Sequence, residues 1–582
     1  MIRLGRHQLL VILVAVGFLC EVTTGKKHHG QELHKLRTKF QKAPPHIHSK
    51  FAYVTWSNDT GYDIKIFAAH LSQPKGLDWV AKARYQNFVN KTGWAFVEVE
   101  SKTTWPDEMQ AYAAGMAEGY LTKDLIYDFW QNTVEHACDD KPKICQYIKK
   151  YVAQNVDWTT QAADKYKTAA PYWHQVNLFI SQFEGLFNGF HKAANGSVAS
   201  RLTWDDLLTI NIMEDFGDLE NALNPNPNPD PTDRSGHCSA LIKLIGNRDI
   251  YASHVTWAPY NTMLRIVKRY NLAYKTSAKD GSPTVPAAEI SFSSYPGMLH
   301  SMDDWYVLSS GLLVTETTIE NYNNDLWAKV KPTNSLFAGL RAMVANRLST
   351  DGQSWTTYFS RYNSGTYNNQ WMILNYNLFE PTKPLNKGLL WVLEQLPGKI
   401  QAKDVTEVLK SQGYWSSYNS PYFKDIFEAS GSPKMVEKYG EFYSYEGTAR
   451  AKIFARDQGQ VEDIDSMMKL MRYNDYQNDP LSRCNCTPPY SAELAISSRN
   501  DMNPVDGQYP IKLLGHRSSG STDMKLTNLD LFLLQQFVSW SGPAYDPLPP
   551  FQWSKTDFKD LPHHGMPDRF EFEPLIHKWK WL

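Results

Sequence analysis

Cysteine is scarce in this chain, with six among 582 residues. That density excludes a scaffold built from disulfides, which needs many more cysteines in a shorter chain. An excess of one charge is absent as well, because 60 Lys and Arg face 61 Asp and Glu, for a formal net charge of −1. A near-neutral chain gives no electrostatic reason to expect a nucleic-acid partner.

Long apolar runs are missing after the N-terminus. The mean hydropathy of −0.48 excludes a polytopic membrane protein. One apolar run, Leu9 to Leu19, follows basic residues and precedes small or polar ones. It is too short for a comfortable membrane span, and its flanks indicate a signal peptide over residues 1–25. We therefore expect entry into the secretory pathway and no transmembrane segment.

Three acceptor sequons fit the secretory route. They begin at Asn58, Asn90 and Asn195, and we expect these asparagines to carry glycans. The C-terminus has no retention signal, so lysosomal delivery and secretion both remain open.

The motifs of several enzyme classes are absent. The sequence has no G-x-S-x-G, which argues against a conventional serine lipase. It also lacks H-E-x-x-H, a P-loop and G-x-G-x-x-G. We therefore expect neither a metal nor a cofactor.

Four of the cysteines form two local groups. Cys138 and Cys145 are seven residues apart, and Cys484 and Cys486 stand in a polar loop before two prolines. In an oxidising compartment they would pair as two disulfides. A zinc site is the alternative for all four, although neither spacing fits a structural zinc motif.

Cys238 is the cysteine left over, since Cys20 lies in the signal peptide. Residues 224–233 alternate Asn or Asp with proline, which predicts an extended, solvated loop. Residues 239–245 and 250–257 indicate a buried hairpin. Cys238 thus lies where a flexible segment meets the first strand. An unpaired cysteine is either buried and inert or a reactive thiol.

This junction suits a nucleophile that chain cleavage exposes. The Cys238 thiol would attack the carbonyl of His237, form a thioester, and be released by water. The new α-amino group of Cys238, with an ordinary pKa near 8, would then act as base for its own thiol. No separately placed histidine is needed.

The remaining sequence predicts a mixture of strands and helices. Alternating residues predict strands at 51–56, 63–71, 93–101, 289–294 and 305–317. Periodic apolar residues predict helices within 107–151, 175–192, 204–223, 258–270 and 335–348. No repeat at solenoid spacing occurs, and aromatic segments are spread evenly. We expect one multilayer domain.

Several specific motifs are spread along most of the chain. They begin with Gly236-His-Cys-Ser-Ala-Leu-Ile-Lys243, His254-x-Thr-Trp257 and Met263-Leu-Arg-Ile266. They continue with Ser293-Ser-Tyr-Pro-Gly297, Glu316-Thr-Thr-Ile319, Val344-Ala-Asn-Arg-Leu348, Asn363-Ser-Gly-Thr-Tyr-Asn-Asn-Gln-Trp371, Tyr414-Trp-Ser-Ser-Tyr-Asn419, Leu470-Met-Arg-Tyr-Asn474, Pro549-Pro-Phe-Gln-Trp553 and His564-Gly-Met-Pro-Asp568. Together these motifs resemble the phospholipase B-like family, with the greater likeness to its lysosomal phospholipase B-like 2 branch. One departure is Cys484-x-Cys486, where the family pattern has two intervening residues; this puts the second disulfide in doubt.

The resemblance implies an N-terminal-nucleophile hydrolase of the α+β class. Its four layers, αββα, place two largely antiparallel sheets between helical layers. It implies cleavage before Cys238 into fragments 26–237 and 238–582, which stay associated as one composite domain. It also implies an acyl hydrolase for a phospholipid ester or a related amide. The substrate would then be a lipid or an N-acyl small molecule, met in solution or by transient contact with a membrane surface.

Two other functions compete with this one. A lysosomal binding or storage glycoprotein would keep the self-cleaving fold without turnover. A papain-like protease would use a separate histidine, but that family's local cysteine signature is absent.

Each candidate site residue has a functional and a structural interpretation. We assign Cys238 as nucleophile. His254 orients the amine or contacts substrate, or else is a core histidine. Asn419 donates to the oxyanion, or else makes the turn before Ser420-Pro421. The candidates for lining the site, which equally suit packing, strand or loop roles, are Trp257, Thr317, Thr318, Asn368 and Asn369.

Overall fold

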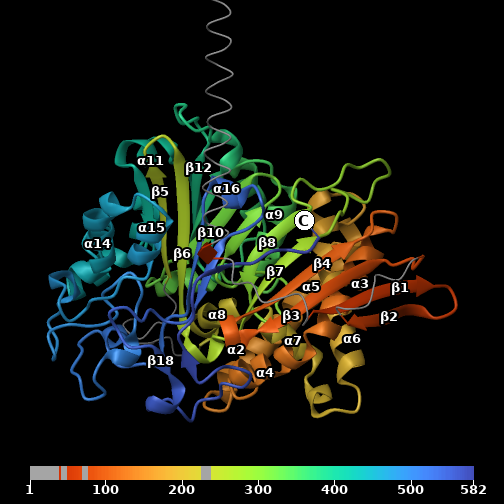
Figure 1. Cartoon of the computed structure of the whole chain (residues 1–582), viewed down its shortest axis with the longest axis horizontal. Coiled ribbons are helices and arrows are strands. Elements are labelled where there is room, and N and C mark those ends of the chain that lie inside the picture. Colours follow the sequence, from red (N-terminus) through yellow and green to blue (C-terminus); the bar gives the residue numbers. More distant parts are fainter. Residues whose placement is uncertain (1–38, 41–48, 69–75, 225–237, 582) are drawn as a thin grey trace, which may run out of the picture.

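The computed structural model describes residues 39–40, 49–68, 76–224 and 238–581 (Figure 1). The expected signal peptide, nearly all of the 224–233 linker and His237 lie outside the described residues. Large antiparallel sheets and many helices make this an α+β protein, as expected.

The larger sheet runs from one side of the molecule to the other. Within the described residues it has eleven strands in the order β13-β12-β11-β10-β9-β8-β7-β4-β3-β1-β2. Neighbours are antiparallel except β4 and β7, which are parallel. The strands are β1 Lys50–Ser57, β2 Gly61–Ala68, β3 Ala81–Phe88, β4 Trp94–Ser101, β7 Arg265–Asn271, β8 Glu289–Ser294, β9 Trp305–Leu308, β10 Leu312–Thr318, β11 Asn369–Asn375, β12 Leu390–Leu396 and β13 Lys399–Asp404.

The smaller sheet contains the predicted hairpin. Its order in the described chain is β14-β5-β6-β16-β17-β20, with β15 also beside β6. Its strands are β5 Cys238–Ile245, β6 Asp249–Pro259, β14 Tyr414–Ser417, β15 Ser519–Ser521, β16 Asp523–Thr527, β17 Val538–Ser541 and β20 Leu575–Ile576. A separate pair joins β18 Phe551–Gln552 to β19 Arg569–Phe570.

Helices cover the outer faces of both sheets. Those in the first half of the chain are α2 Val89–Thr92, α3 Asp107–Leu121, α4 Lys123–Thr133, α5 Pro142–Tyr166, α6 Pro171–Ala194, α7 Trp204–Ile210 and α8 Phe216–Leu223. Later come α9 Ala338–Leu348, α10 Gly352–Phe359, α11 Thr406–Gln412, α12 Lys424–Ala429, α13 Ser432–Tyr439, α14 Ala449–Asp457, α15 Ile464–Met471 and α16 Leu529–Phe532.

Alternation along β5 shows how the layers are built. Ala240 and Ile242 point between the sheets, where they share a core with Trp305 of β9. Leu241 points the other way and packs with Phe454 of α14 and the methionines of α15. Because side chains alternate along a strand, one hairpin can serve both cores. Helices α3, α6, α9 and α10 share a third core with the outer face of the larger sheet. The order helix, sheet, sheet, helix is the expected αββα arrangement.

The predicted helix over 258–270 is wrong. A short 3-10 turn at Tyr260–Thr262 is followed by strand β7. The charged residues of this segment suggested the exposed face of a helix. In the structure Arg265, Lys268 and Arg269 are all buried and form ion pairs with acidic residues. Both faces of β7 are therefore buried, which the spacing of its apolar residues did not reveal.

One strand prediction needs correction, and one strand was missed. The strand predicted over 305–317 is the hairpin of β9 and β10, which turns at Gly311 with φ of 93°. Strand β3 was not anticipated at all, although it pairs with β1 and β4 at the centre of that part of the sheet. Its sequence, Ala-Lys-Ala-Arg-Tyr-Gln-Asn-Phe, carries polar side chains that are buried in the fold.

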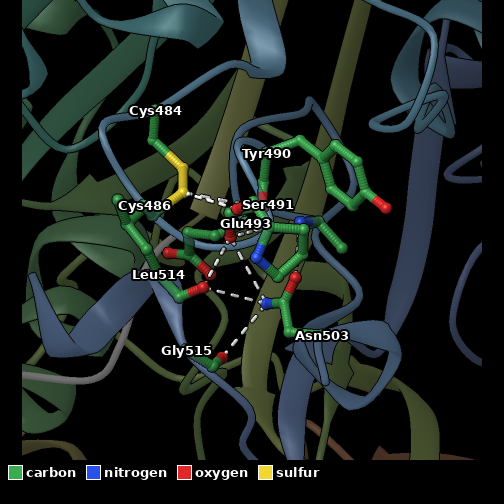
Figure 2. Close-up of a disulfide and its surroundings, with 10 residues drawn as sticks. Cys484, Cys486, Tyr490, Ser491, Glu493, Asn503, Leu514 and Gly515 are labelled. Carbon is green, nitrogen blue, oxygen red and sulfur yellow. Dashed lines mark hydrogen bonds between the residues drawn. A yellow bond between two sulfur atoms is a disulfide. The ribbon is translucent and has the colours of Figure 1, made fainter. Parts of the chain in front are cut away.

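Both expected cysteine pairs are joined. Cys138 bonds Cys145 at the start of α5, and Cys484 bonds Cys486 in a loop (Figure 2). Beside that loop, Asn503 Nδ2 donates to the carbonyl oxygens of Leu514, at 3.0 Å, and Gly515. The departure from the family spacing therefore does not prevent the second bond. No helix of the described chain is long and apolar enough to cross a membrane.

Candidate active site

Cys238 is the first residue of β5, directly opposite Thr256 of β6. Its side chain is free of disulfide bonding, and the residue is 5% exposed. Its main-chain nitrogen donates to Asn419 Oδ1 at 3.2 Å. Arg450 Nη1 donates to the Cys238 carbonyl oxygen at 2.6 Å and to Asn419 Oδ1 at 2.7 Å. Two side chains from distant segments thus hold the main chain on both sides of this cysteine.

Two other reactive groups lie close to the thiol. Donor atoms of Cys238, His254 and Glu316 all lie within 4.8 Å of one another, and the three residues are buried. They come from β5, β6 and β10. In β6, His254 pairs in register with Ala240 on one side and Lys525 on the other. The paired strands β5 and β6 of the smaller sheet and β10 of the larger sheet, which packs against β5, therefore bring these side chains together from positions far apart in sequence.

The three groups differ in how they are satisfied. Neither ring nitrogen of His254 has a partner within the distance and angle limits of a hydrogen bond among the described residues, although the main chain of Glu316 is close enough to favour the protonated ring. Glu316 Oε1 accepts from the Tyr367 hydroxyl at 3.2 Å. With its amide nitrogen turned toward the carboxyl group, Asn369 donates to Glu316 Oε2 at 3.0 Å. Glu316 is thus fixed by its neighbours, while His254 is held by strand pairing and packing.

Burial determines the protonation of the cluster. It raises the pKa of the Cys238 thiol well above its usual value; the charge of Glu316 adds to this, and the Trp257 N–H acts against it. Burial and Lys525 hold the pKa of His254 well below its usual value. Burial also raises the pKa of Glu316. In the uncleaved chain the thiol and imidazole are therefore neutral, and neither supplies a ready thiolate.

A buried charge network lies beside Thr256. Lys525 Nζ bonds Thr256 Oγ1 at 2.5 Å, Asp303 Oδ2 at 2.8 Å and Asp523 Oδ1 at 2.8 Å. Arg265 bonds the same two acids, and all four charged side chains are fully buried. Although burial alone would raise the pKa of Asp303, Arg265 and Lys525 hold it well below its usual value. The two positive and two negative charges cancel. The network therefore holds Thr256 of β6, the residue opposite Cys238, in place without a net buried charge.

Asn419 has a larger positioning role than its sequence context indicated. Its Nδ2 donates to the Thr318 carbonyl oxygen at 2.7 Å, while its Oδ1 faces Cys238. Its main-chain N–H donates to Thr317 Oγ1 at 3.4 Å, and that hydroxyl bonds Ser417 at 2.7 Å. Thr317 and Thr318 therefore support Asn419. The Asn419 amide nitrogen carries two hydrogens, and the bond to Thr318 uses one of them, so the oxyanion role expected of Asn419 stays a prediction.

Comparison with known proteins gives a family for this arrangement. The Phospholipase B family profile matches residues 81–577. The chain is 44% identical to phospholipase B-like 2 of Bos taurus, over 86% of each chain. It is 42% identical to that of Rattus norvegicus, over 86% of this chain and 87% of the relative. A Caenorhabditis elegans phospholipase B-like 2 is 41% identical over 90% of each. This chain belongs to the phospholipase B-like family.

The other predicted lining residues of this phospholipase B-like chain lie at different places. Trp257 donates from Nε1 to the Ile496 carbonyl oxygen at 3.2 Å, and the Arg450 guanidinium lies 4.3 Å from the centre of its ring. Asn369 reaches Glu316 as described. Asn368 instead donates to Asp218 Oδ2 at 2.9 Å. Trp257 and Asn369 therefore support the site, whereas Asn368 ties β11 to α8.

Several residues at this site were not singled out from the sequence. Glu316 stood inside a family motif, but nothing in its local pattern distinguished it from a surface acid. Arg450, in α14, lies in no motif that we recognised. Lys525 is in β16 of the smaller sheet and Asp303 lies just before β9 of the larger sheet, so they become neighbours only where the two sheets meet. A buried charged residue leaves no signal in one sequence, because its partner is supplied by the fold.

A pocket lies beside the main chain of Cys238. Its volume is about 50 Å³, and Asn419 and Arg450 are among the residues that line it. A larger pocket of about 450 Å³ shares three of its lining residues, Phe442, Ala449 and Leu494. The larger pocket is also lined by the disulfide loop at Cys484 and by Lys438, Lys452 and Arg483. The two pockets are therefore neighbours, and Cys238 itself is not among the lining residues of either. The larger pocket also contains Glu441, which pairs with Lys452.

Proposed function

We propose that this phospholipase B-like chain is an acyl hydrolase for a lipid ester or amide, activated by cleavage before Cys238. The position of Cys238 carries the proposal. The Cys238 thiol is buried and forms no disulfide, and the residue is the first of strand β5. Its main-chain nitrogen donates a hydrogen bond to Asn419, and its carbonyl oxygen accepts one from Arg450. A cysteine that only packs in the core does not need a side-chain hydrogen bond to its main-chain nitrogen. A nitrogen that becomes a catalytic amine after cleavage does need one, because the amine must be oriented.

The cleavage step balances without any added reagent except water. The Sγ atom forms a bond to the carbonyl carbon of His237 as the bond from that carbon to the Cys238 nitrogen breaks. The nitrogen takes up the thiol proton. Water then hydrolyses the thioester, which leaves a carboxyl group on His237, a free thiol and a free α-amine.

The same two groups then act on substrate. The amine accepts the thiol proton while Sγ attacks the acyl carbonyl, and the ammonium returns a proton to the leaving alcohol or amine. Water hydrolyses the acyl thioester. Burial disfavours the free thiolate, so the reaction needs a base close to Sγ. The new α-amine belongs to Cys238 itself and is therefore close to Sγ. Asn419 Oδ1 is placed to orient that amine.

The substrate class follows from the family and the pocket. The relatives carry the name phospholipase B-like. The larger pocket combines apolar residues such as Leu494 and Ile511 with Lys438, Arg483 and the ion pair of Lys452 and Glu441. Apolar surface suits an acyl chain, and basic residues suit a phosphate headgroup. Secretory processing belongs to the same proposal, and the sequon residues Asn58, Asn90 and Asn195 are all exposed.

The test compares the wild-type chain with Cys238→Ala and with Ser411→Ala, an exposed control. Each protein is matured at mildly acidic pH, its fragments are sequenced from the N-terminus, and turnover is measured on a diacyl phospholipid and an N-acyl amide panel. We expect wild type and control to give a fragment that begins at Cys238 and to release fatty acid. Cys238→Ala should remain one chain. Normal processing of that variant would refute the mechanism.

The binding or storage alternative has its own outcome in this experiment. The wild-type chain would then be cleaved and its Cys238 would react with iodoacetamide, yet no substrate of either class would be turned over. That result would retain the self-cleaving site and reject the hydrolase.

A further inference from the structure

The cluster at Cys238 also contains a set of metal-binding donors. A thiol, an imidazole and a carboxyl group, from Cys238, His254 and Glu316, lie within 4.8 Å of one another. Zinc takes these three ligand types, with bonds of about 2.0–2.3 Å, and in many sites three protein ligands leave a fourth position open. Those bond lengths place ligand atoms roughly 3.5 Å apart in a tetrahedron. Shifts of about 1 Å would therefore bring the donors to one ion.

The hydrogen bonding of the cluster is an independent second observation. His254 is fully buried, and neither ring nitrogen has a partner that meets the distance and angle limits of a hydrogen bond among the described residues. The main chain of Glu316 is its one polar neighbour close enough to favour the protonated ring, which leaves at least one ring nitrogen for a metal. A neutral imidazole buried in this way is costly, because each nitrogen loses its contact with water. A metal bond would satisfy one of them. Around it, Tyr367 and Asn369 hold Glu316, the kind of outer contact that orients a metal-binding carboxylate.

Charge balance also favours a divalent cation. A thiolate and a carboxylate together carry two negative charges, which one dication would neutralise. The neighbouring network of Arg265, Lys525, Asp303 and Asp523 is already balanced and needs no counter-ion. The ion would thus enter a buried site without leaving an unpaired charge.

We propose that Cys238, His254 and Glu316 bind a zinc-type divalent cation, and that the bound ion reversibly blocks the nucleophile. The ion replaces the protons of the thiol and the carboxyl group, which pass to water; no electron is transferred. Cleavage before Cys238 would add its α-amine as a fourth donor, and this part rests on the proposed function. Amine and thiol of one residue close a five-membered chelate ring.

This inference concerns regulation of the site. The metal would occupy both the thiol and the amine that turnover requires, so acylation and metal binding exclude each other. Free zinc would keep the hydrolase inactive until a competing chelator or a lower metal concentration released it. The expectation that the chain binds no metal, drawn from absent motifs, addressed only local spacing; these donors come from three strands.

The experiment uses cobalt(II) as the probe on the full processed protein and on the uncleaved chain. A thiolate bound to cobalt gives charge-transfer absorption in the near ultraviolet, and a tetrahedral site gives strong visible bands. We expect both signals at one cobalt per chain, with zinc displacing them. The variants are His254→Gln and Glu316→Gln, with His136→Gln, an exposed histidine, as the matched control.

We expect each cluster variant to bind cobalt at least about tenfold more weakly, the scale on which even outer contacts change metal affinity. The His136→Gln control should bind as wild type does. Wild-type protein alone gives a second measurement: zinc should slow alkylation of Cys238 by iodoacetamide. Absence of the charge-transfer band, or a band that both cluster variants retain at full affinity, would overturn the proposal.

Failure of this inference can be told from failure of the proposed function. If the chain is not cleaved, the three side-chain donors remain, and the uncleaved chain should still show the thiolate–cobalt band. If the chain is cleaved and active but shows no band and no zinc protection, the metal site is rejected and the hydrolase stands.

Discussion

Asn419 combines an unusual backbone with a dense set of contacts. Its φ is 69°, in the left-handed region that asparagine tolerates better than most residues. From that position its side chain reaches Cys238, Arg450 and Thr318 at once. The left-handed backbone conformation of Asn419 therefore accompanies the hydrogen bond that its side chain accepts from the Cys238 nitrogen. Unusual backbone conformations of this kind are common at functional sites.

Replacing Asn419 by glycine separates these two features. Asn419→Gly keeps the backbone conformation and removes the side chain. We expect precursor cleavage and turnover to fall about 100-fold, because the attacking groups lose their alignment. The thermal midpoint should fall modestly, because the side-chain hydrogen bonds to Cys238, Arg450 and Thr318 are lost. Asn419→Ala also loses the side chain and adds backbone strain of about 1 kcal/mol or more, so it should melt lower. Cleavage of the glycine variant at the wild-type rate would remove Asn419 from the mechanism.

How far single residues could be predicted depended on the kind of signal they carry. Cys238 was found by counting, since four other cysteines were expected to pair and Cys20 lies in the predicted signal peptide, and by its place after a proline-rich segment. Arg450 and Glu316 carry no such signal. Each is an ordinary charged residue whose meaning comes from a partner hundreds of positions away or on another strand. Their roles required the fold.

At the scale of elements, β7 shows where pattern reasoning fails. Met263, Leu264 and Val267 match one helical face, but the same spacing suits a strand that is buried on both sides. The deciding fact is that Lys268 meets Glu118 of α3 in the core. Strands β5, β6 and β8 were predicted well because their apolar or alternating runs ended at clear turns.

Helices α3 and α6 pack with their backbones in direct contact. A Cβ atom on Gly115 would lie 1.9 Å from the Gln182 carbonyl oxygen, and one on Gly185 would lie 1.9 Å from that of Tyr112. No side chain fits at such a distance, so glycine is required for close approach and not for its φ. This contact holds the outer helical layer on the larger sheet.

The Gly185→Ala variant tests this contact. The added methyl group must push α6 away from α3, which should destabilise the protein by about 1–3 kcal/mol. Gly217→Ala in α8 is the matched control, because its Cβ would meet nothing within 4 Å. Alanine is the better helix former by up to about 1 kcal/mol, so the control should be neutral or slightly stabilising. Thermal midpoints compare the two; an equal or higher midpoint for Gly185→Ala would contradict close packing.

At the scale of the whole molecule, the two sides of the proposed cleavage site are interleaved. Strand β4 precedes Cys238 in sequence and β7 follows it, yet they pair along their length in one sheet. Residues from both sides also share the core under α3 and α6. The chain therefore cannot be divided at residue 237 into two units that each own a core.

We accordingly expect the fragments 26–237 and 238–582 to stay together after cleavage. Separating them would break the β4–β7 pairing and expose the shared core. On size exclusion, cleaved and uncleaved protein should elute together, and only denaturant should resolve the fragments under non-reducing conditions. Spontaneous separation of the fragments in native buffer would contradict a single composite domain.

Buried acids give the molecule a dependence of stability on pH. Burial raises the pKa of Glu394 to about 7, against hydrogen bonds from Gln370 and two main-chain N–H groups. It raises the pKa of Asp249 to about 6. The folded state then binds more protons than the unfolded state between the ordinary carboxyl pKa and these values, so stability falls as pH rises through that window. Asp303, whose pKa is lowered, acts oppositely and loses stability below its ordinary value.

Burial also lowers the pKa of His254 and of His300, so these histidines lose stability as pH falls below about 6.5. Glu316 and Asp215, whose pKa values are raised to about 8 and about 7, offset this by adding to the effect of Glu394 and Asp249.

The stability maximum should therefore lie at mildly acidic pH, which suits the lysosomal destination better than the extracellular one. Each shifted pKa unit corresponds to about 1.4 kcal/mol, so Glu394 and Asp249 together contribute a few kcal/mol between pH 5 and pH 8. We expect a thermal midpoint several degrees higher at pH 5. Asp249→Asn should flatten this dependence, since the amide cannot ionise and its oxygen can still accept from the main-chain N–H groups of Ile250 and Leu529. Asp280→Asn, at an exposed carboxyl, is the control that should leave the slope unchanged. A midpoint that rises from pH 5 to pH 8 would show that these carboxyl groups are ionised in the folded protein without cost.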